Sequence, residues 1–376
     1  CCSHALPSHS RRQAGVVMKE LTMTDLAKVI GFRPSDEQIA AIKSPLEPSM
    51  IVAGAGTGKT TVMAARIAWL IMTQQVAPDR ILGLTFTTKA ANELLNRVRS
   101  YLPKALTFLP PEAAQLDVGE PIISTYNAFG SRLLKEHALR LGLEPDARVV
   151  VDATRYQLAM RVVCMTSQDL GVLGYTPTIA VTELLKLDEH CSNYLVQPSA
   201  IIESDMLRLA SLNGVEKKQK LTEEMIETSA KRIALAELVL DFRKAKLAND
   251  VIDYSDQIRL AAQAAQNSET MRSLLKEQFQ VVLLDEYQDT SLSQKVLLQQ
   301  LFGEGHPVMA VGDPCQAIYG WRGAEITNMG NFKTDFPRVI AGRQEPAAIY
   351  NLTVNRRSGK NILAAANVLS DQLRVI

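Results

Sequence analysis

The sequence predicts an α/β fold in which a parallel sheet, covered by helices on both faces, is interrupted by a helical insertion. Short apolar runs alternate with helical stretches near both ends of the chain, which is the pattern of parallel strands buried on both faces. Between them a long stretch has helical periodicity and charge-rich turns instead. The length of 376 residues leaves room for two or three compact units.

Composition and charge are those of an ordinary globular protein. Hydrophobic residues make up 47% and charged residues 22% of the chain, which argues against disordered and fibrous classes. The 41 basic and 40 acidic residues leave a net charge of +1, so bulk charge indicates neither a nucleic-acid nor a membrane partner. The five scattered cysteines lack zinc-site spacing and favour a reducing cytoplasm. No apolar run reaches the roughly 20 residues that span a bilayer, so we expect a soluble chain.

The change of pattern along the chain predicts the unit boundaries. Residues 1–18 have no apolar signal core and end at Met18, a candidate start residue, so we expect a disordered or non-native tail. The first α/β unit is predicted in two parts, residues 19–132 and 279–336. Residues 133–278 are the predicted helical insertion, and residues 337–376 are the predicted beginning of another unit.

Individual elements follow in order from their apolar patterns. The predicted strands of the first unit are apolar runs followed by polar loops: Ile51–Ala53, Ile81–Phe86, Ile122–Ser124, Val281–Leu284 and Val308–Val311. The amphipathic stretch Lys89–Tyr101 predicts a helix packed on this sheet. In the last unit Ile349–Val354 is strand-like and Lys360–Leu373 is helical. Strands that alternate with helices in this way predict a doubly wound layer.

A glycine-rich loop follows the first predicted strand and leads into a helix near Lys59. The loop has the sequence Ala53-Gly54-Ala55-Gly56-Thr57-Gly58-Lys59-Thr60-Thr61, with Ala53 in place of the usual first glycine. The glycines let backbone N–H groups close around phosphate oxygens at a helix N-terminus. Lys59 is placed to neutralise the β and γ phosphates, and Thr60 to offer its hydroxyl to Mg²⁺. A structural turn is the alternative for the glycines alone, but strand, Gly-Lys-Thr and helix together predict nucleotide binding.

Two carboxylates, Asp285 and Glu286, come directly after the predicted strand Val281–Leu284. Ligands of open α/β sheets bind at the carboxyl ends of the strands, which is where these side chains belong. Asp285 is suited to hold Mg²⁺ through its water shell, and Glu286 to orient or deprotonate the water that attacks the γ-phosphate. A solvated turn is the alternative for an isolated Asp-Glu pair, and the glycine-rich loop makes the ATPase interpretation the better one.

Lys59 and Asp285 lie much further apart in the chain than a minimal nucleotide-binding core requires, so a segment is inserted between them. With this insertion and its ordered motifs, the chain resembles the superfamily 1 DNA helicases of the UvrD, Rep and PcrA type. The resemblance implies a RecA-like P-loop NTPase sheet with an inserted helical subdomain, followed by the start of a second RecA-like domain.

Several further motifs carry the resemblance to the nucleotide side of this family. Pro34-Ser35-Asp36-Glu37-Gln38 is similar to the adenine-reading segment, which implies that Gln38 contacts the base edge. Ser35 and Gln38 also have the spacing of a helix capping box, and both roles can hold. The motif Gly312–Ala324 implies that Gln316 senses the γ-phosphate, and Asn355-Arg356-Arg357 implies that Arg357 is an arginine finger. Arg356 stands where the family usually has a tyrosine that stacks on adenine.

The same resemblance implies a track for single-stranded DNA. Thr85-Phe86-Thr87 and Thr125-Tyr126-Asn127 are similar to two DNA-contacting motifs, although Tyr126-Asn127 departs from the commoner Phe-His. The implied DNA contacts are Thr85, Phe86, Thr125, Tyr126, Asn127, Tyr319, Trp321 and Arg322. Rings stack on bases and hydroxyls reach phosphates in such sites. A place in the protein core is the alternative for Phe86 and for Trp321.

The resemblance implies an ATP- and Mg²⁺-dependent 3′ to 5′ DNA helicase that acts on single-stranded and 3′-tailed duplex DNA. The implied partners are repair or recombination proteins, and no membrane partner is implied. The implied location is the bacterial cytoplasm, at the nucleoid. One alternative is the motor portion of a RecB-type helicase-nuclease; another is a truncated protein that binds nucleotide and DNA without unwinding. Because the sequence stops soon after Arg357, we expect an N-terminal fragment of a longer motor.

Overall fold

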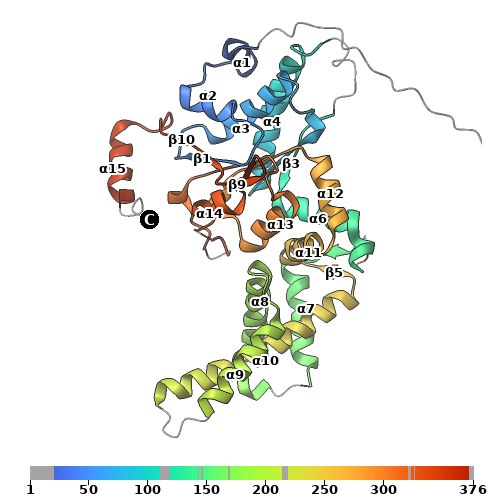
Figure 1. Cartoon of the computed structure of the whole chain (residues 1–376). Helices are drawn as coiled ribbons and strands as arrows, with labels where there is room; N and C mark the ends of the chain where they lie inside the picture. Colours follow the sequence, from blue (N-terminus) through green and yellow to red (C-terminus); the bar gives the residue numbers. More distant parts are fainter. Residues whose placement is uncertain are drawn as a thin grey trace, which may run out of the picture.

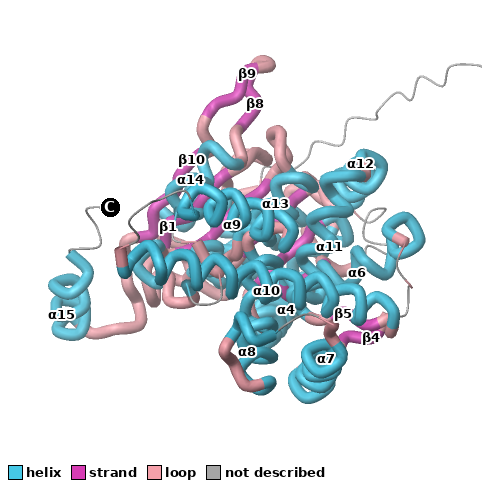
Figure 2. The backbone as a smooth tube through the Cα atoms, turned by 90° about the horizontal axis from the view of Figure 1, so that it is seen from below, coloured by secondary structure: helices cyan, strands magenta, loops and turns pink. Residues whose placement is uncertain are grey.

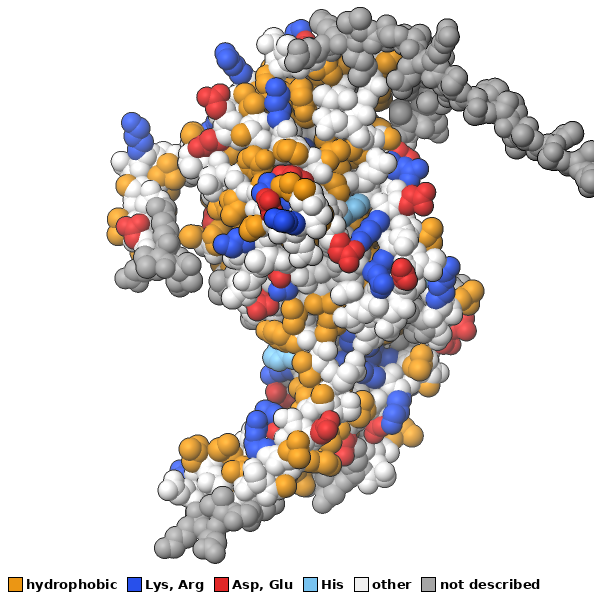
Figure 3. Space-filling model, viewed as in Figure 1, with side chains coloured by type: hydrophobic (Ala, Val, Ile, Leu, Met, Phe, Trp, Pro, Cys, Tyr) orange, Lys and Arg blue, Asp and Glu red, His pale blue; other side chains and the backbone are white. Residues whose placement is uncertain are grey.

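The computed structural model describes residues 21–110, 119–142, 144, 147–167, 170–213, 219–320, 323–325 and 327–371. The predicted tail, residues 1–18, lies outside these ranges. Figure 1 shows an α/β body, a helical arm that extends from it, and the last helix, α15 (Lys360–Ser370), beside the body. On the face drawn in Figure 3, acidic and basic side chains are intermixed, in keeping with the balanced charge of the chain.

A six-stranded sheet forms the centre of the body, with the strand order β10-β1-β7-β6-β2-β3. All five neighbouring pairs are parallel, which confirms the predicted sheet. Every strand overlaps a predicted apolar run. Their bounds are β1 Ser49–Ala53, β2 Ile81–Thr85, β3 Ile122–Thr125, β6 Val281–Leu284, β7 Val308–Gly312 and β10 Ala348–Leu352.

Helices cover both faces of the sheet, because successive strand side chains point to opposite faces and both sets are apolar. In β6, for example, Leu283 belongs to one core and its neighbours Val282 and Leu284 to the other. The first core is closed by α1 (Met23–Ile30), α2 (Asp36–Ile42), α3 (Lys59–Met72) and α4 (Thr88–Leu106). The second is closed by α6 (Tyr126–His137), α11 (Tyr254–Asn267), α12 (Glu269–Gln278), α13 (Leu292–Phe302) and α14 (Thr327–Asp335).

In the part of the chain that the structure describes, the arm contains four α-helices with a separate core. Its helices are α7 (Asp152–Met165), α8 (Pro177–Asn193), α9 (Pro198–Asn213) and α10 (Lys220–Ala248), and its core includes Leu184, Val239 and Phe242. At its base β4 (Arg148–Val149) pairs with β5 (Val251–Ile252). Part of the predicted helical insertion therefore packs around a core of its own.

Short elements complete the chain. A hairpin of β8 (Arg338–Ile340) and β9 (Arg343–Glu345) projects from the body, as Figure 2 shows. The 3₁₀ turns are Pro78–Arg80, Ala138–Leu141, Leu170–Leu173, Tyr287–Asp289 and Pro314–Gln316. Within the described ranges, no helix combines the length and the apolar character that crossing a bilayer requires.

Two predicted boundaries differ from the structure. Helices α11 and α12 lie within the predicted insertion, residues 133–278, but their apolar faces pack into the second core of the body. Strand β10 lies within the predicted last unit, residues 337–376, but it pairs with β1, Ser49 opposite Ala348. Both differences have one cause: the partners of these segments are distant in sequence, so local periodicity does not reveal them.

A buried ionic cluster lies where the arm meets the body. Lys246 on α10 is only 3% exposed, and its Nζ lies 2.9 Å from Asp188, 3.0 Å from Asp253 and 2.7 Å from Asp256. Arg155 of α7 also contacts Asp253, at 3.1 Å. Burial alone would raise the pKa of Asp253, but Lys246 and Arg155 hold it well below its usual range. The cluster joins α7, α8 and α10 of the arm to the start of α11.

Candidate functional site

The glycine-rich loop connects β1 directly to α3, as the sequence predicts. Gly56 has φ +74° and Gly58, which precedes the helix, has φ +94°, a left-handed region that favours glycine. Ala53 is the last residue of β1 and is fully buried. Its methyl group therefore packs into the core below the loop, which explains why alanine is accepted in place of the usual first glycine.

Lys59 and Glu286 meet across the site. The Nζ of Lys59, at the start of α3, lies 2.8 Å from Oε2 of Glu286, which follows β6. Gln288 donates to the same carboxylate oxygen at 2.8 Å. Glu286 has a left-handed φ of +47°, a strained conformation for a non-glycine residue and one that is concentrated at functional sites. The strand end thus aims this carboxylate at the lysine of the loop.

Asp285 and Thr60 have the chemistry of Mg²⁺ ligands. Asp285 is buried at the end of β6, and burial together with the charge of Glu286 raises its pKa to about 6. A cation nearby would favour the charged form of this carboxylate. Thr60 supplies a hydroxyl oxygen from the first turn of α3. Oxygen donors of this kind, few in number, suit Mg²⁺, which keeps several waters and binds substrate phosphates.

A cavity of about 250 Å³ opens above the loop and brings most of the predicted nucleotide residues together. Its lining consists of Ala55, Gly56, Gly58, Lys59, Thr60, Thr61, Glu93, Arg97, Glu286, Gln316 and Arg357. Two of these, Glu93 and Arg97 on α4, were not predicted. Arg97 donates to the Thr61 hydroxyl at 2.7 Å. Glu93 and Arg97 stand four positions apart on a helix, which is the spacing of an ordinary solvated ion pair. Only their position beside the loop distinguishes them from such a pair.

A chain of hydrogen bonds connects the carboxylates after β6 with the loop after β7. Gln288 accepts from the backbone N–H of Asp313 at 3.1 Å while its amide donates to Glu286. The Asp313 carboxylate in turn accepts from the Gln316 amide. Asp313 belongs to a predicted motif and Gln288 follows the predicted pair Asp285 and Glu286, but neither had a predicted role. They link the side chain predicted to sense phosphate, Gln316, to the predicted base.

Gln38 is buried beneath the loop. Its amide donates to the Thr57 carbonyl at 3.1 Å, and its own carbonyl accepts from the Ser35 N–H at 3.1 Å. The second bond is the Gln38 half of the predicted capping box at the start of α2. Both ends of the side chain bind the protein here, and the predicted contact of Gln38 with adenine stays a prediction.

Two aromatic residues predicted to contact DNA stack on each other. Phe86 follows β2 and Tyr319 lies in the loop after β7; their ring centroids are 5.0 Å apart with 29° between the planes. Neither ring is fully buried. The other two residues predicted from this loop, Trp321 and Arg322, lie outside the described residues.

The remaining predicted DNA residues differ in exposure. Thr85 is fully buried and donates to the Thr87 carbonyl, and Tyr126 is 3% exposed with its ring in the second core. Strand β2 and helix α6 turn both side chains inward, and the predicted DNA contacts of Thr85 and Tyr126 stay predictions. The Thr125 hydroxyl accepts from the Ala128 N–H at 3.2 Å and so caps α6. Asn127 is the residue of this motif that faces a cavity.

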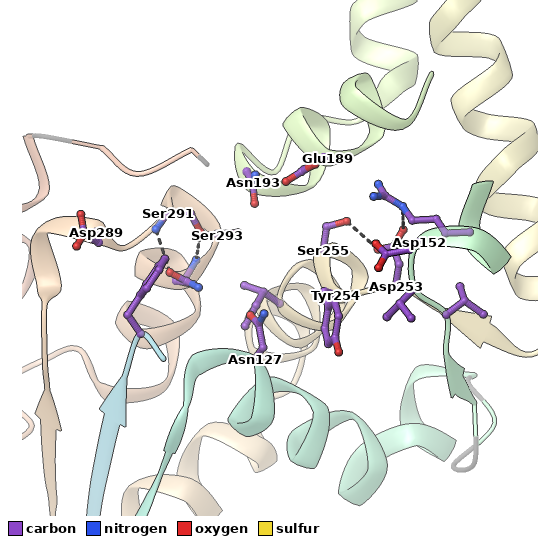
Figure 4. A pocket seen from close by; sticks show the side chains of 16 residues that line it. Asn127, Asp152, Glu189, Asn193, Asp253, Tyr254, Ser255, Asp289, Ser291 and Ser293 are labelled. Atoms are coloured by element: carbon purple, nitrogen blue, oxygen red, sulfur yellow. Dashed lines mark hydrogen bonds and ion pairs between the residues drawn. The ribbon is translucent and has the colours of Figure 1, made fainter. Parts of the chain in front are cut away.

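That second cavity, of about 620 Å³, lies between the arm and the body. Figure 4 shows Glu189 and Asn193 of α8 on one side, and Asn127, Tyr254 and two serines at the start of α13, Ser291 and Ser293, on the other. Phe86 also lines it. The lining is mostly polar, with aromatic rings at Phe86 and Tyr254. It has the amide, hydroxyl and ring groups that can bind unstacked nucleobases.

Comparison with known proteins decides the family. Residues 35–337 match the model of the UvrD/REP helicase N-terminal domain. The chain belongs to this family. It is 29% identical to the ATP-dependent DNA helicase PcrA of Leuconostoc citreum over 336 residues, 89% of this chain and 38% of that protein. It is 29% identical to PcrA of Bacillus subtilis (90% and 39%) and 27% identical to DNA helicase II of Escherichia coli (89% and 40%).

Membership of the UvrD/REP family confirms the predicted resemblance and the RecA-like sheet with its inserted helices. The chain spans about two fifths of the length of the curated relatives that it matches. The part matched by the family model contains the loop, Asp285, Glu286 and Tyr319, and it ends before β10 and Arg357.

Proposed function

We propose that the chain binds ATP with Mg²⁺ and hydrolyses it, and that hydrolysis drives movement along single-stranded DNA. The observation that carries the proposal is the cavity above the loop. It collects Lys59, Thr60, Glu286, Gln316 and Arg357 from four separate parts of the chain. A lysine, a carboxylate, a glutamine and an arginine around one cavity are groups of the kind that phosphoryl transfer uses.

In the proposed reaction Lys59 leaves Glu286 for the β and γ phosphates. Glu286, released from the ion pair, then accepts a proton from the attacking water. Gln316 and Arg357 stabilise negative charge on the γ-phosphate, as positioned donors do in this reaction class. Thr60 and Asp285 would hold the Mg²⁺ ion, whose bound charge neutralises the phosphate oxygens.

The proposed coupling to DNA runs through the loop after β7. Gln316 lines the nucleotide cavity, and Tyr319, three positions later, stacks on Phe86. A movement of Gln316 toward a phosphate would shift Tyr319 relative to Phe86. The separated rings would offer a stacking site for one base. Phe86 and Asn127 also line the large cavity between body and arm.

Direction and context are further parts of the proposal. The relatives are named as DNA helicases, and we propose 3′ to 5′ movement on single-stranded and 3′-tailed duplex DNA in repair or recombination. Such a substrate would place the protein in the cytoplasm, at the nucleoid. A RecB-type helicase-nuclease motor remains the alternative within the class.

The test compares ATP hydrolysis by the purified chain with and without single-stranded DNA, beside its Lys59→Ala variant. We expect hydrolysis that DNA stimulates and that Lys59→Ala abolishes. Strand displacement on 3′-tailed and 5′-tailed duplexes, with the same chain, then tests direction. Hydrolysis that is indifferent to DNA would contradict the motor, and nucleotide and DNA binding without hydrolysis would favour the binding-only alternative.

A further inference from the structure

The segment Thr353–Ser358, here called the clasp segment, lies directly against the glycine-rich loop. The backbone N–H of Arg356 donates to the Gly56 carbonyl at 2.9 Å. The Asn355 amide donates to the Ala55 carbonyl at 2.6 Å. The two contacts hold adjacent peptide groups of the loop.

The same asparagine also fixes the backbone on either side of the predicted arginine finger. Its Oδ1 accepts from the N–H of Arg357 and from the N–H of Ser358, each at 2.8 Å. One side chain therefore binds the loop with its amide group and the backbone of Arg357 with its carbonyl oxygen. The side-chain amide group of Asn355 thus bridges the loop and the Arg357 backbone.

Helix α2 holds the beginning of the clasp segment. The Glu37 carboxylate accepts from the N–H of Thr353 at 2.9 Å and from its hydroxyl. These hydrogen bonds lower the pKa of Glu37. The next residue, Gln38, donates to the Thr57 carbonyl of the loop. The first turn of α2 thus bonds both the loop and the segment that covers it.

The fit between loop and clasp segment is close. A Cβ atom added to Gly56 would lie 2.6 Å from Cβ of Arg357 and 3.0 Å from the Asn355 amide. Such a distance is shorter than van der Waals contact allows, so the clasp segment can approach only because residue 56 is glycine.

These bonds determine which way the loop's donors point. The carbonyls of Ala55, Gly56 and Thr57 are bound by Asn355, Arg356 and Gln38. In a trans peptide the carbonyl and the following N–H point in opposite directions, and the described residues contain no cis peptide. The N–H groups of Gly56 and Gly58 therefore face away from these partners. The N–H between them, that of Thr57, donates within the loop to the Gly54 carbonyl at 3.4 Å. Backbone N–H groups directed into one concavity can bind phosphate oxygens.

We propose that Asn355 is a positioning residue that couples the phosphate-binding loop to Arg357. This proposal rests on the proposed ATPase function. By holding the Ala55 carbonyl, Asn355 keeps the N–H groups of the loop directed at the phosphates. By holding the Arg357 backbone, it sets the guanidinium over the same cavity. Phosphate binding and arginine placement are thereby linked through one side chain.

The test starts with Asn355→Asp, which keeps the oxygen that accepts from Arg357 and replaces the donating amide with a second oxygen beside the Ala55 carbonyl. We expect the Kd for a fluorescent ADP analogue to rise about tenfold, the equivalent of one lost hydrogen bond with added repulsion. Asn351→Ala, an exposed asparagine on β10, is the matched control and should leave the Kd unchanged. An unchanged Kd for Asn355→Asp would overturn the proposal.

The second measurement asks whether Asn355 acts through Arg357. We expect Asn355→Ala to lower kcat, and the double variant with Arg357→Ala to be no slower than Arg357→Ala alone. Rate losses that multiply in the double variant would overturn the coupling. If the Asn355 variants do not fold, Thr353→Val is the second variant, because it removes only the hydroxyl bond to Glu37. It should raise the Kd for ADP to a smaller extent. An unchanged Kd would count against the proposed role of the clasp segment.

One control separates this inference from the proposed function. Lys59→Ala should lose ADP-analogue binding whether or not the clasp exists. If it binds like the parent chain, the proposed ATPase site is wrong. If Lys59→Ala loses binding while Asn355→Asp and Thr353→Val do not, the proposed ATPase site is supported and only the proposed role of the clasp segment is wrong.

Discussion

At the scale of single residues, the ion pair of Lys59 with Glu286 matters most. The lysine that is proposed to bind phosphate and the carboxylate that is proposed to act as base neutralise each other at 2.8 Å. A bound phosphate must compete with Glu286 for the lysine. In the proposed reaction the same competition would free Glu286 for proton transfer only when phosphate is present, so the ion pair would restrain the proposed base until the substrate binds.

Replacing Glu286 by Gln should separate binding from turnover. The amide has nearly the same size but cannot take a proton, so we expect kcat for ATP hydrolysis to fall by about 10²- to 10⁴-fold. The Kd for ADP should stay constant or fall, because Lys59 loses a charged competitor. Steady-state hydrolysis and analogue titration measure the two quantities. A kcat equal to that of the parent chain would place the base elsewhere.

Much of this site could be predicted from residue types and their spacing. Lys59, Thr60, Glu286, Gln316 and Arg357 were predicted from separate motifs, and the structure gathers them around one cavity. The missed residues are of another kind. Arg97 and Asn355 contact the loop only because α4 and the clasp segment are packed beside it, and tertiary placement of this sort leaves no local pattern.

At the scale of elements, two loops meet through the rings of Phe86 and Tyr319. One loop follows β2 and the other follows β7, and these strands are separated in the sheet by β6. Their stack closes the surface between the two strand ends. It also provides two aromatic faces that a nucleobase could occupy in turn.

Replacing Phe86 by Leu removes the aromatic ring from this stack but keeps an apolar side chain at position 86. We expect the affinity for single-stranded DNA, measured by fluorescence anisotropy, to weaken by about 1–3 kcal/mol, the usual worth of one base stacked on an aromatic ring. The thermal midpoint should change little, since the ring is not fully buried. An earlier unfolding transition with unchanged DNA affinity would instead assign Phe86 to the core.

Replacing Gly56 by Ala tests the close approach of loop and clasp segment. Alanine at φ +74° is strained, and its Cβ would collide with Arg357, so we expect a loss of about 1–2 kcal/mol in the free energy of unfolding. Nucleotide affinity should fall as well. The control is Gly330→Ala in α14, where nothing lies within 4 Å of the added atom. Equal denaturation midpoints for the two variants would contradict the close fit.

Element types were predictable where the apolar pattern was strong, and unit boundaries were not. The predicted runs in β1, β2, β6 and β7 are buried strands, because both faces of each are apolar. Helix α11 looks like its neighbours in the insertion, yet its face of Ile258, Ala261 and Ala265 packs on the body. Which core an amphipathic helix joins depends on the whole chain, and its own sequence records only that it has an apolar face.

At the scale of the whole molecule, the arm is held to the body by charge as well as by apolar packing. Lys246 bonds three carboxylates at the junction, one from α8 and two from the start of α11. A buried lysine with three acids around it fixes one arrangement of these helices. The cavity between arm and body lies beside this junction, because Arg155 and Asp253 line it too.

Replacing Lys246 by Met should loosen this junction. Three buried carboxylates would lose their shared cation, and we expect the free energy of unfolding to drop by about 3–5 kcal/mol. Thermal unfolding measures the loss, and a separate early transition would show the arm melting before the body. The control is Lys244→Met, whose exposed partner is Asp241 on the arm surface. A Tm as high as that of the control would mean that packing alone orients the arm.

The pairing of β1 also has a consequence for the newly made chain. The strand that leads into the loop has its neighbours at Val308–Gly312 and Ala348–Leu352, and Ser49 lies opposite Ala348. Contacts between residues so far apart in the sequence form late, because the intervening chain must first be closed into a loop. At roughly 5 to 20 residues per second, a ribosome needs on the order of 15 to 60 seconds to add the roughly 300 residues between these partners. Strand β1 therefore lacks both neighbours until residues 308–312 are made, and lacks β10 for the whole interval, which leaves the strand before the proposed nucleotide loop exposed to chaperones.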